Sequence, residues 1–172
     1  MKKKKIVLIY KNFVSLLFKL KYGQVRNVIK KSNDVNIFKI RKQKKILTFY
    51  QINKCRIYTD TIHDTAFIHK DSIVDGASFQ LRNFINSNIK NNKVLTQGTP
   101  KILKKISGFT LSIITGGGGN NNYWHWLFDV LPRIALVENK FSLKSFNHVL
   151  VPNNQHKFQI ETLKILKIYH KS

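Results

Sequence analysis

An alternation of apolar strands and helices in the last third of the chain constrains the fold most. The segments "FTLSIIT" (109–115) and "FNHVLVP" (146–152) have the composition of buried strands. Residues 122–139 and 156–169 carry apolar residues at helical spacing. Strand, helix, strand, helix is typical of a parallel sheet, because parallel neighbours need a crossover connection. The pattern predicts an α/β fold.

The preceding part of the chain has a different texture. Residues 46–85 contain short β-prone pieces separated by polar turns, which predicts an antiparallel meander. Asp75-Gly76 is its best hairpin signal. Before it, residues 11–31 predict a helix broken near Gly23, and residues 34–40 predict a strand.

Positive charge is concentrated at the N-terminal end. The net charge is +23, and residues 1–45 hold 15 of the 31 Lys and Arg but only one acidic residue. We therefore divide the chain into a basic, partly helical segment, 1–45, and a second domain, 46–172. Such charge suits nucleic acid, anionic lipid or phosphorylated ligands. Codon bias toward Lys, Asn and Ile is the competing explanation for the rest of the charge.

Cysteine content and the N-terminal apolar segment set further limits. The single cysteine, Cys55, excludes an intrachain disulfide and a cysteine-based metal site. Lys11 interrupts the apolar run after "MKKKK", so no stretch reaches the ~18 apolar residues of a membrane span. Residues 13–20 either lie on an anionic membrane surface or pack on the domain. We expect a cytoplasmic protein, with peripheral membrane contact as the alternative.

The helix predicted over residues 122–139 has two distinct faces. Its expected core face contains Tyr123, Leu127, Val130, Leu131 and Ile134. A second stripe is formed at i, i+4, i+8 by His125, Asp129 and Arg133, and Trp126 borders it. Pro132 predicts a kink or a restart, because it lacks an N–H and clashes with the carbonyl of Phe128.

A run of four glycines, 116–119, lies between the predicted strand and this helix. Helix N-termini favour anions, so the run suits a phosphate. It matches neither the P-loop pattern nor the dinucleotide fingerprint. A loop over a cleft is the alternative.

The segment "NYWHWLFDVLPRIALVE" resembles the signature of the family-61 glycosyltransferases, N-Y-x-H-W-L-x-D-x-L-P-R. The matching residues are Asn122, Tyr123, His125, Trp126, Leu127, Asp129, Leu131, Pro132 and Arg133. The flanking "RIYTD…DSIVDGAS" and "HVLVPNN…FQIETLKIL" extend the resemblance over residues 50–170. It implies a Rossmann-like, acceptor-side half of a GT-B enzyme. We therefore expect this chain to form one half of the catalytic fold and to show little transferase activity in isolation.

The resemblance also implies a reaction, the inverting transfer of a sugar from a nucleotide-sugar donor to an acceptor hydroxyl in cell-surface polysaccharide synthesis. His125 or Asp129 would act as the base, and Arg133 would pair with a phosphate or carboxylate. Trp124 and Trp126 would stack on a sugar ring. The other expected substrate-binding residues are Asn122, Tyr123, Gly118 and Gly119.

The expected ligands are a nucleotide sugar and a glycan acceptor, with no further cofactor and no metal. A basic module that binds nucleic acid or membrane without catalysis is the alternative function, and a protein with no activity of its own is a third. Nucleic acid fits less well, because both tryptophans lie in a helix of mixed charge rather than among Lys and Arg on a β-surface.

Overall fold

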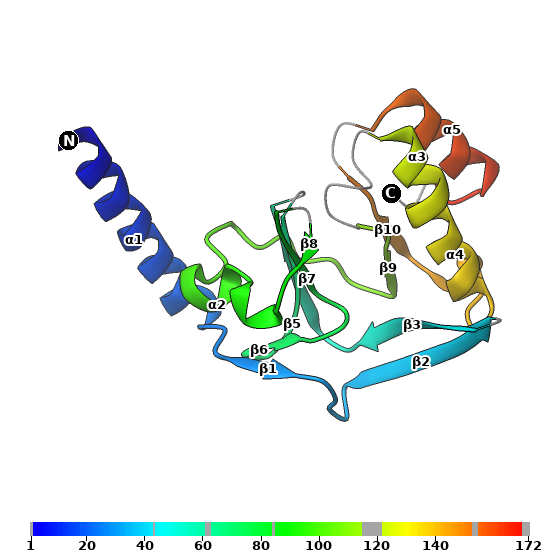
Figure 1. The fold of residues 1–172 in the computed structure, drawn as a ribbon, viewed down its shortest axis with the longest axis horizontal. Coiled ribbons are helices and arrows are strands. Elements are labelled where there is room, and N and C mark those ends of the chain that lie inside the picture. The colour runs from blue at the N-terminus through cyan, green and yellow to red at the C-terminus, as the bar shows by residue number, and fades with distance from the viewer. Residues whose placement is uncertain are drawn as a thin grey trace. The chain divides into compact units, whose positions relative to one another are not determined.

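The computed structural model describes residues 2–42, 44–60, 63–83, 85–114, 122–152 and 155–169, without the side chains of residues 2–6, 42 and 86. It is a mixed α/β structure that divides into two compact units (Figure 1). Unit 1 comprises Met1–Ile37, Tyr50–Thr59 and Asp64–Lys104, and unit 2 comprises Phe38–Phe49, Asp60–His63 and Lys105–Ser172.

Unit 1 is built around a mixed sheet. Its elements are α1 (Lys2–Tyr22), β1 (Asn27–Ile29), β4 (Cys55–Thr59), β5 (Asp64–His69), β6 (Ser72–Val74), β7 (Phe79–Arg82), β8 (Ile85–Asn86), η1 (Ile89–Asn91) and α2 (Val94–Gln97). The strand order is β1-β6-β5-β7-β8, and β4 also pairs with β5. All pairs are antiparallel except β1 with β6. The predicted meander is thus confirmed in its antiparallel pairing and extended by a parallel strand from the N-terminal segment.

The prediction of a hairpin at Asp75-Gly76 is wrong. Strands β6 and β7 both pair with β5 and not with each other in the described register. The chain turns here at Gly76, whose φ is +84°, and any side chain at that position would collide with the Tyr50 hydroxyl. The tight hairpin turn lies instead between β5 and β6, where Lys70 has a φ of 55°. Register, which a dipeptide signal does not encode, decides which strands pair.

The core of unit 1 is small and aliphatic. It consists of Val25, Ala66, Ile68, Ile73 and Val94. Ala66 and Ile68 of β5 point into this core, and Thr65 and His69 on the other face of the strand are buried as well. Val25 and β1 therefore tie the N-terminal segment into this unit, and the predicted boundary after residue 45 does not coincide with either compact unit.

The first helix ends at the break expected near Gly23, and it begins before residue 11. It covers Lys2–Tyr22 rather than residues 11–31, and the chain leaves it at Gly23, where φ is +80°. A residue with positive φ after the last turn is the usual glycine stop signal. Residues 27–29, assigned to the helix from sequence, form β1 because their partner is β6. None of the described helices combines the length and apolarity that crossing a bilayer requires.

Unit 2 contains the predicted alternation of strands and helices. Its elements are β9 (Thr110–Ser112), α3 (Tyr123–His125), η3 (Trp126–Val130), α4 (Leu131–Glu138), η4 (Leu143–Ser145), β10 (His148–Leu150) and α5 (Lys157–Ile165). Strands β9 and β10 pair in parallel, with Leu111 opposite Val149. The predicted strand-helix-strand-helix order is confirmed, with shorter strands than the apolar runs suggested.

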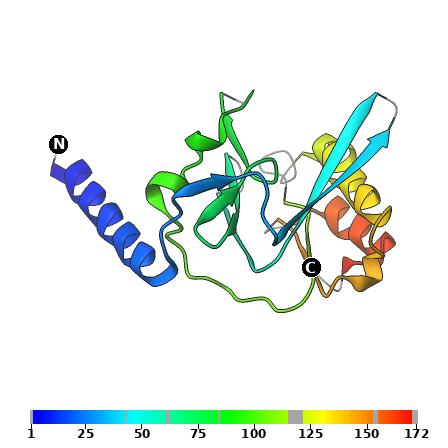
Figure 2. The same cartoon turned by 90° about the horizontal axis from the view of Figure 1, so that it is seen from below.

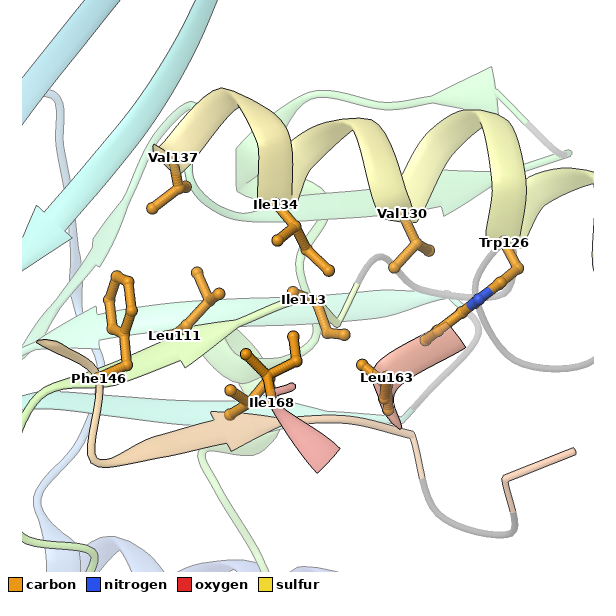
Figure 3. Packing of buried hydrophobic residues seen from close by; sticks show 10 residues of the cluster. Leu111, Ile113, Trp126, Val130, Ile134, Val137, Phe146, Leu163 and Ile168 are labelled. Carbon is orange, nitrogen blue, oxygen red and sulfur yellow. The ribbon is translucent and has the colours of Figure 1, made fainter. Parts of the chain in front are cut away.

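Side chains from every major element of unit 2 form one core (Figure 3). The core side chains of the helix are Trp126, Val130, Ile134 and Val137. They point toward Leu111 of β9, toward Ile113 just after it, and toward Phe146, Leu163 and Ile168. Burial of these apolar side chains provides the main stabilisation of the unit. The core therefore fixes which face of the α3–α4 helix remains available to solvent.

A two-stranded hairpin contributes residues to both units. It pairs β2 (Val35–Lys42) with β3 (Lys45–Ile52). Phe38 and Phe49 stack at 4.9 Å between ring centroids, and Phe141 meets Phe38 edge-on. The strand predicted over residues 34–40 is confirmed, and it continues to Lys42.

Candidate functional site

The helix that carries the predicted site begins at a capping residue. The side-chain oxygen of Asn122 accepts hydrogen bonds from the backbone N–H groups of Trp124 (2.9 Å) and His125 (3.4 Å). Such a cap satisfies donors that the first turn leaves unpaired. Asn122 was predicted to bind substrate, but this oxygen has a structural task. It fixes the start of the helix and thereby the position of the residues that follow.

A widened turn precedes Pro132. Residues Trp126–Val130 form a π-helical turn, in which the N–H of Leu131 donates to the carbonyl of Trp126, five residues back. The α-helix then continues as α4, with Pro132 in its first turn, where its missing N–H is tolerated. The expected kink or restart thus takes the form of a π turn, a feature frequent at functional sites.

The π turn changes which aromatic residue enters the core. A turn closed over five residues holds one residue more than an α turn, so the residues before it are rotated relative to those after it. Trp126 is 0% exposed, and its indole N–H donates to the Thr162 hydroxyl at 2.8 Å. Tyr123, predicted to be in the core, is exposed and meets Phe158 edge-on.

Trp126 therefore has no free ring face for a sugar, and its predicted stacking role is corrected. In Figure 3 its ring points into the core of unit 2. The α-helical wheel assigned Trp126 to the border of the exposed stripe because a wheel assumes one helical period across the whole segment.

His125 and Asp129 form the shortest polar pair of the helix. The Nδ1 atom of His125 lies 2.6 Å from Oδ2 of Asp129, and the two side chains are 45% and 49% exposed. An ionised carboxylate only accepts hydrogen bonds, so Nδ1–H is the donor, and in the neutral imidazole Nε2 carries the lone pair. Within the part of the chain that the structure describes, Asp129 is the only partner of this imidazole. The second ring nitrogen is therefore available to a ligand.

Arg133 extends this pair by one helical turn. Arg133 is exposed as a residue, but its guanidinium group is partly desolvated by surrounding protein atoms, and this desolvation lowers the pKa of Arg133. The charge of the Asp129 carboxylate acts in the opposite direction on the same pKa. The predicted stripe of His125, Asp129 and Arg133 is thus electrostatically coupled through its central residue.

An exposed pair of aromatic rings neighbours the dyad in sequence. Trp124 and Phe128 are 66% and 56% exposed, and their ring centroids are 4.3 Å apart. They are related by i, i+4, as His125 and Asp129 are. Trp124 was predicted as a stacking residue, whereas Phe128 was missed. Its spacing from Trp124 was the signal that could have identified it.

Other predicted features lie outside the described residues. These are the glycine run, including Gly118 and Gly119, and the loop that it was predicted to form over a cleft. Among the residues that are described, no group of three or more His, Cys, Asp or Glu side chains is arranged to hold a metal ion.

Comparison with known proteins does not add to the description of this site. No family model, no curated protein and no solved structure matches the chain. The likeness to the family-61 glycosyltransferases therefore stays a prediction carried by the residues of the signature.

Proposed function

We propose that this chain supplies the acceptor-side base of an inverting glycosyltransferase that takes a nucleotide-sugar donor. The observation that carries the proposal is the exposed His125–Asp129 pair, with 2.6 Å between Nδ1 and Oδ2. A carboxylate that accepts the Nδ1 proton fixes the imidazole in the tautomer whose Nε2 accepts protons. His125 is then the base, and Asp129 orients it and stabilises the imidazolium that forms.

The transfer requires one proton acceptor and one leaving group. The acceptor hydroxyl oxygen bonds to the anomeric carbon, while the bond from that carbon to the phosphate oxygen breaks. The hydroxyl proton passes to Nε2 of His125, and the nucleotide leaves with the bonding electrons. Proton transfer to a positioned side chain contributes about 10²–10⁴-fold to a rate of this kind.

Two further features of the helix support a sugar substrate. The exposed rings of Trp124 and Phe128 offer the flat apolar surface on which the C–H face of a pyranose stacks. Arg133, coupled to Asp129, offers a guanidinium fork for an anionic group of donor or acceptor. The base, the aromatic surface and the cation all come from a single helix. The Asn122 cap and the core of unit 2 therefore position all three.

The fold is compatible with the same proposal at the level of a supersecondary unit. Parallel strands β9 and β10, with the α3–α4 helix between them and α5 after them, form a β-α-β-α unit of the kind from which Rossmann-like domains are built. Assignment to the GT-B class is part of the proposal. In such folds ligands bind beyond the carboxyl ends of the strands, and the α3–α4 helix follows β9.

A transfer assay tests the proposed function. The full chain is incubated with a panel of nucleotide sugars and oligosaccharide acceptors, and release of free nucleotide is measured together with acceptor binding by isothermal titration calorimetry. We expect acceptor binding that Trp124→Ala weakens. Nucleotide release should be low, because the chain supplies only half of the catalytic fold, and His125→Ala should reduce it to the uncatalysed background.

His63→Ala is the matched control, because His63 also lies beside an aspartate, with 3.8 Å between its Nδ1 atom and Oδ2 of Asp60. It should change neither readout. Nucleotide release that is equal in wild type and His125→Ala, or a chain that binds no acceptor in the panel, would count against the proposal.

A further inference from the structure

Helix α1 leaves an apolar side uncovered, although Val14, Phe18 and Tyr22 on its opposite side are half-buried. The side that contacts the rest of unit 1 includes Ser15 and Lys19, whose side chains donate to the backbone carbonyls of Gln97 (2.6 Å) and Thr96 (2.8 Å). The exposed side is apolar and consists of Ile9, Tyr10, Phe13, Leu16, Leu17 and Leu20. Surface helices normally bury their apolar stripe and expose their polar one.

Within the described residues, the hydrogen bonds that join α1 to the rest of unit 1 come from its C-terminal half. Ser15, Lys19 and the Tyr22 carbonyl, which accepts from Arg56 at 2.7 Å, hold this end. In Figures 1 and 2 the last turns lie beside α2, and the N-terminal turns extend away from the other elements of unit 1. The helix is therefore anchored at one end, with its apolar side uncovered along the described residues.

The charge of α1 identifies what suits this uncovered side. The helix contains seven lysines and no acidic residue, with four lysines at its start and Lys19 and Lys21 in its last turn. Cationic residues at both ends of an apolar stripe match a surface that is apolar inside and negatively charged at its boundary. A bilayer with anionic headgroups has that layered chemistry.

We propose that α1 docks unit 1 onto an anionic lipid bilayer. The apolar side from Ile9 to Leu20 enters the boundary between headgroups and acyl chains, and the helix lies in the plane of the membrane. Lys21 and the lysines at the start of the helix contact the anionic headgroups, where each contributes electrostatic attraction that salt screens. Ser15 and Lys19 keep the remainder of unit 1 on the aqueous side.

A second copy of the chain fits this surface less well. Pairing two α1 helices through their apolar sides would bring seven lysines of each copy together without a compensating acidic residue. Like charges at an interface oppose association. An anionic bilayer covers the same apolar area and neutralises the same charges.

Vesicle sedimentation with the full chain tests the proposal. The vesicles are phosphatidylcholine alone, or equal parts phosphatidylcholine and phosphatidylserine. The test variant is Leu16→Ser with Leu20→Ser, and the control is Ile85→Ser with Ile165→Ser. Leu20 and Ile165 are 76% and 77% exposed, so each variant replaces two exposed aliphatic residues outside the core.

We expect binding to the phosphatidylserine vesicles that falls when salt is raised from about 0.05 to 0.5 M. The Leu16/Leu20 variant should bind at least about tenfold more weakly, because it loses two membrane-inserted side chains. The control variant should bind like the wild type, and circular dichroism should show that both variants retain the fold.

Three outcomes would overturn the proposal. The first is equal affinity for neutral and anionic vesicles, and the second is equal affinity of the two double variants. The third is a dimer in sedimentation velocity, or a complex with RNA, that only the Leu16/Leu20 variant weakens. That result would assign the apolar side to a second copy or to nucleic acid. None of these readouts depends on the proposed sugar transfer.

Discussion

Two aspartates with basic neighbours occupy opposite environments in this protein. Asp64 in unit 1 is 2% exposed, and Arg82 contacts its two oxygens at 3.2 and 3.1 Å. Lys93 approaches the same carboxylate with its ammonium group at 3.4 Å and its backbone N–H at 3.3 Å. Asp129 in unit 2 is 49% exposed and contacts His125 alone by hydrogen bond among the described residues.

The difference separates a structural carboxylate from a candidate for chemistry. A buried charge must have all its lone pairs satisfied, and breaking such a set is costly. An exposed pair contributes little to stability, about 0–1 kcal/mol, because water competes with each partner. A carboxylate that makes a short hydrogen bond, is exposed and contributes little to stability can take part in ligand binding or catalysis without a cost to the fold. Burial, rather than residue type or neighbour, thus distinguishes the two sites.

The largest expected effect sharpens this contrast within a single helix. Trp126→Ala removes a fully buried indole and its hydrogen bond to Thr162 and should lower the free energy of unfolding by about 3–5 kcal/mol. Trp124→Ala, at an exposed ring two residues away, should change it by about 0.5 kcal/mol or less. Urea denaturation of both variants measures the difference. Equal losses would show that the π turn does not set which tryptophan is buried.

A smaller effect is expected when the buried aspartate loses its main partner. Arg82→Met removes the two-point partner of the buried Asp64 carboxylate while Lys93 remains beside it, and the free energy of unfolding should fall by about 3 kcal/mol. This is the lower end of the range for broken buried pairs, because one cation remains. Lys144→Met, at an exposed lysine of unit 2, is the control for loss of positive charge. A fall in the free energy of unfolding below about 1 kcal/mol would show that the Asp64 pair contributes as little to stability as the exposed Asp129 pair.

The smallest effect on stability is expected at the exposed aspartate. Asp129→Asn keeps the size of the side chain and removes its charge. The free energy of unfolding should change by about 0.5 kcal/mol or less, as for other exposed i, i+4 pairs. The same urea titration measures it. A fall in the free energy of unfolding of about 2 kcal/mol or more would identify Asp129 as a residue that stabilises the helix, and would contradict its assignment as an exposed functional carboxylate.

The order of elements in unit 2 could be predicted because apolar runs and helical spacing are local signals. Leu111 and Val149 lie in such runs, and both are buried in parallel strands. Pro132 correctly indicated an irregularity. The form of that irregularity could not be predicted, because a π turn depends on how the completed core accepts Trp126. The exchange of Tyr123 for Trp126 follows from that one turn.

Pairing between distant segments limited the prediction of unit 1. Residues 27–29 carry no mark that separates them from the preceding helix, and they become β1 only through pairing with residues 72–74. The apolar residues of α1 suggested a helix that either packs on the domain or meets a membrane. Contacts of Ser15 and Lys19 with α2, which no local pattern encodes, determine that its apolar side faces outward.

The tautomer of His125 is the most direct test of the role proposed for the dyad. Nitrogen-15 NMR of the imidazole in mildly alkaline solution, assigned by comparison with His125→Ala, identifies which ring nitrogen carries the proton. We expect the proton on Nδ1 and a free lone pair on Nε2 in the wild type, and loss of this preference in Asp129→Ala. A proton on Nε2 in the wild type would contradict the assignment of His125 as the base.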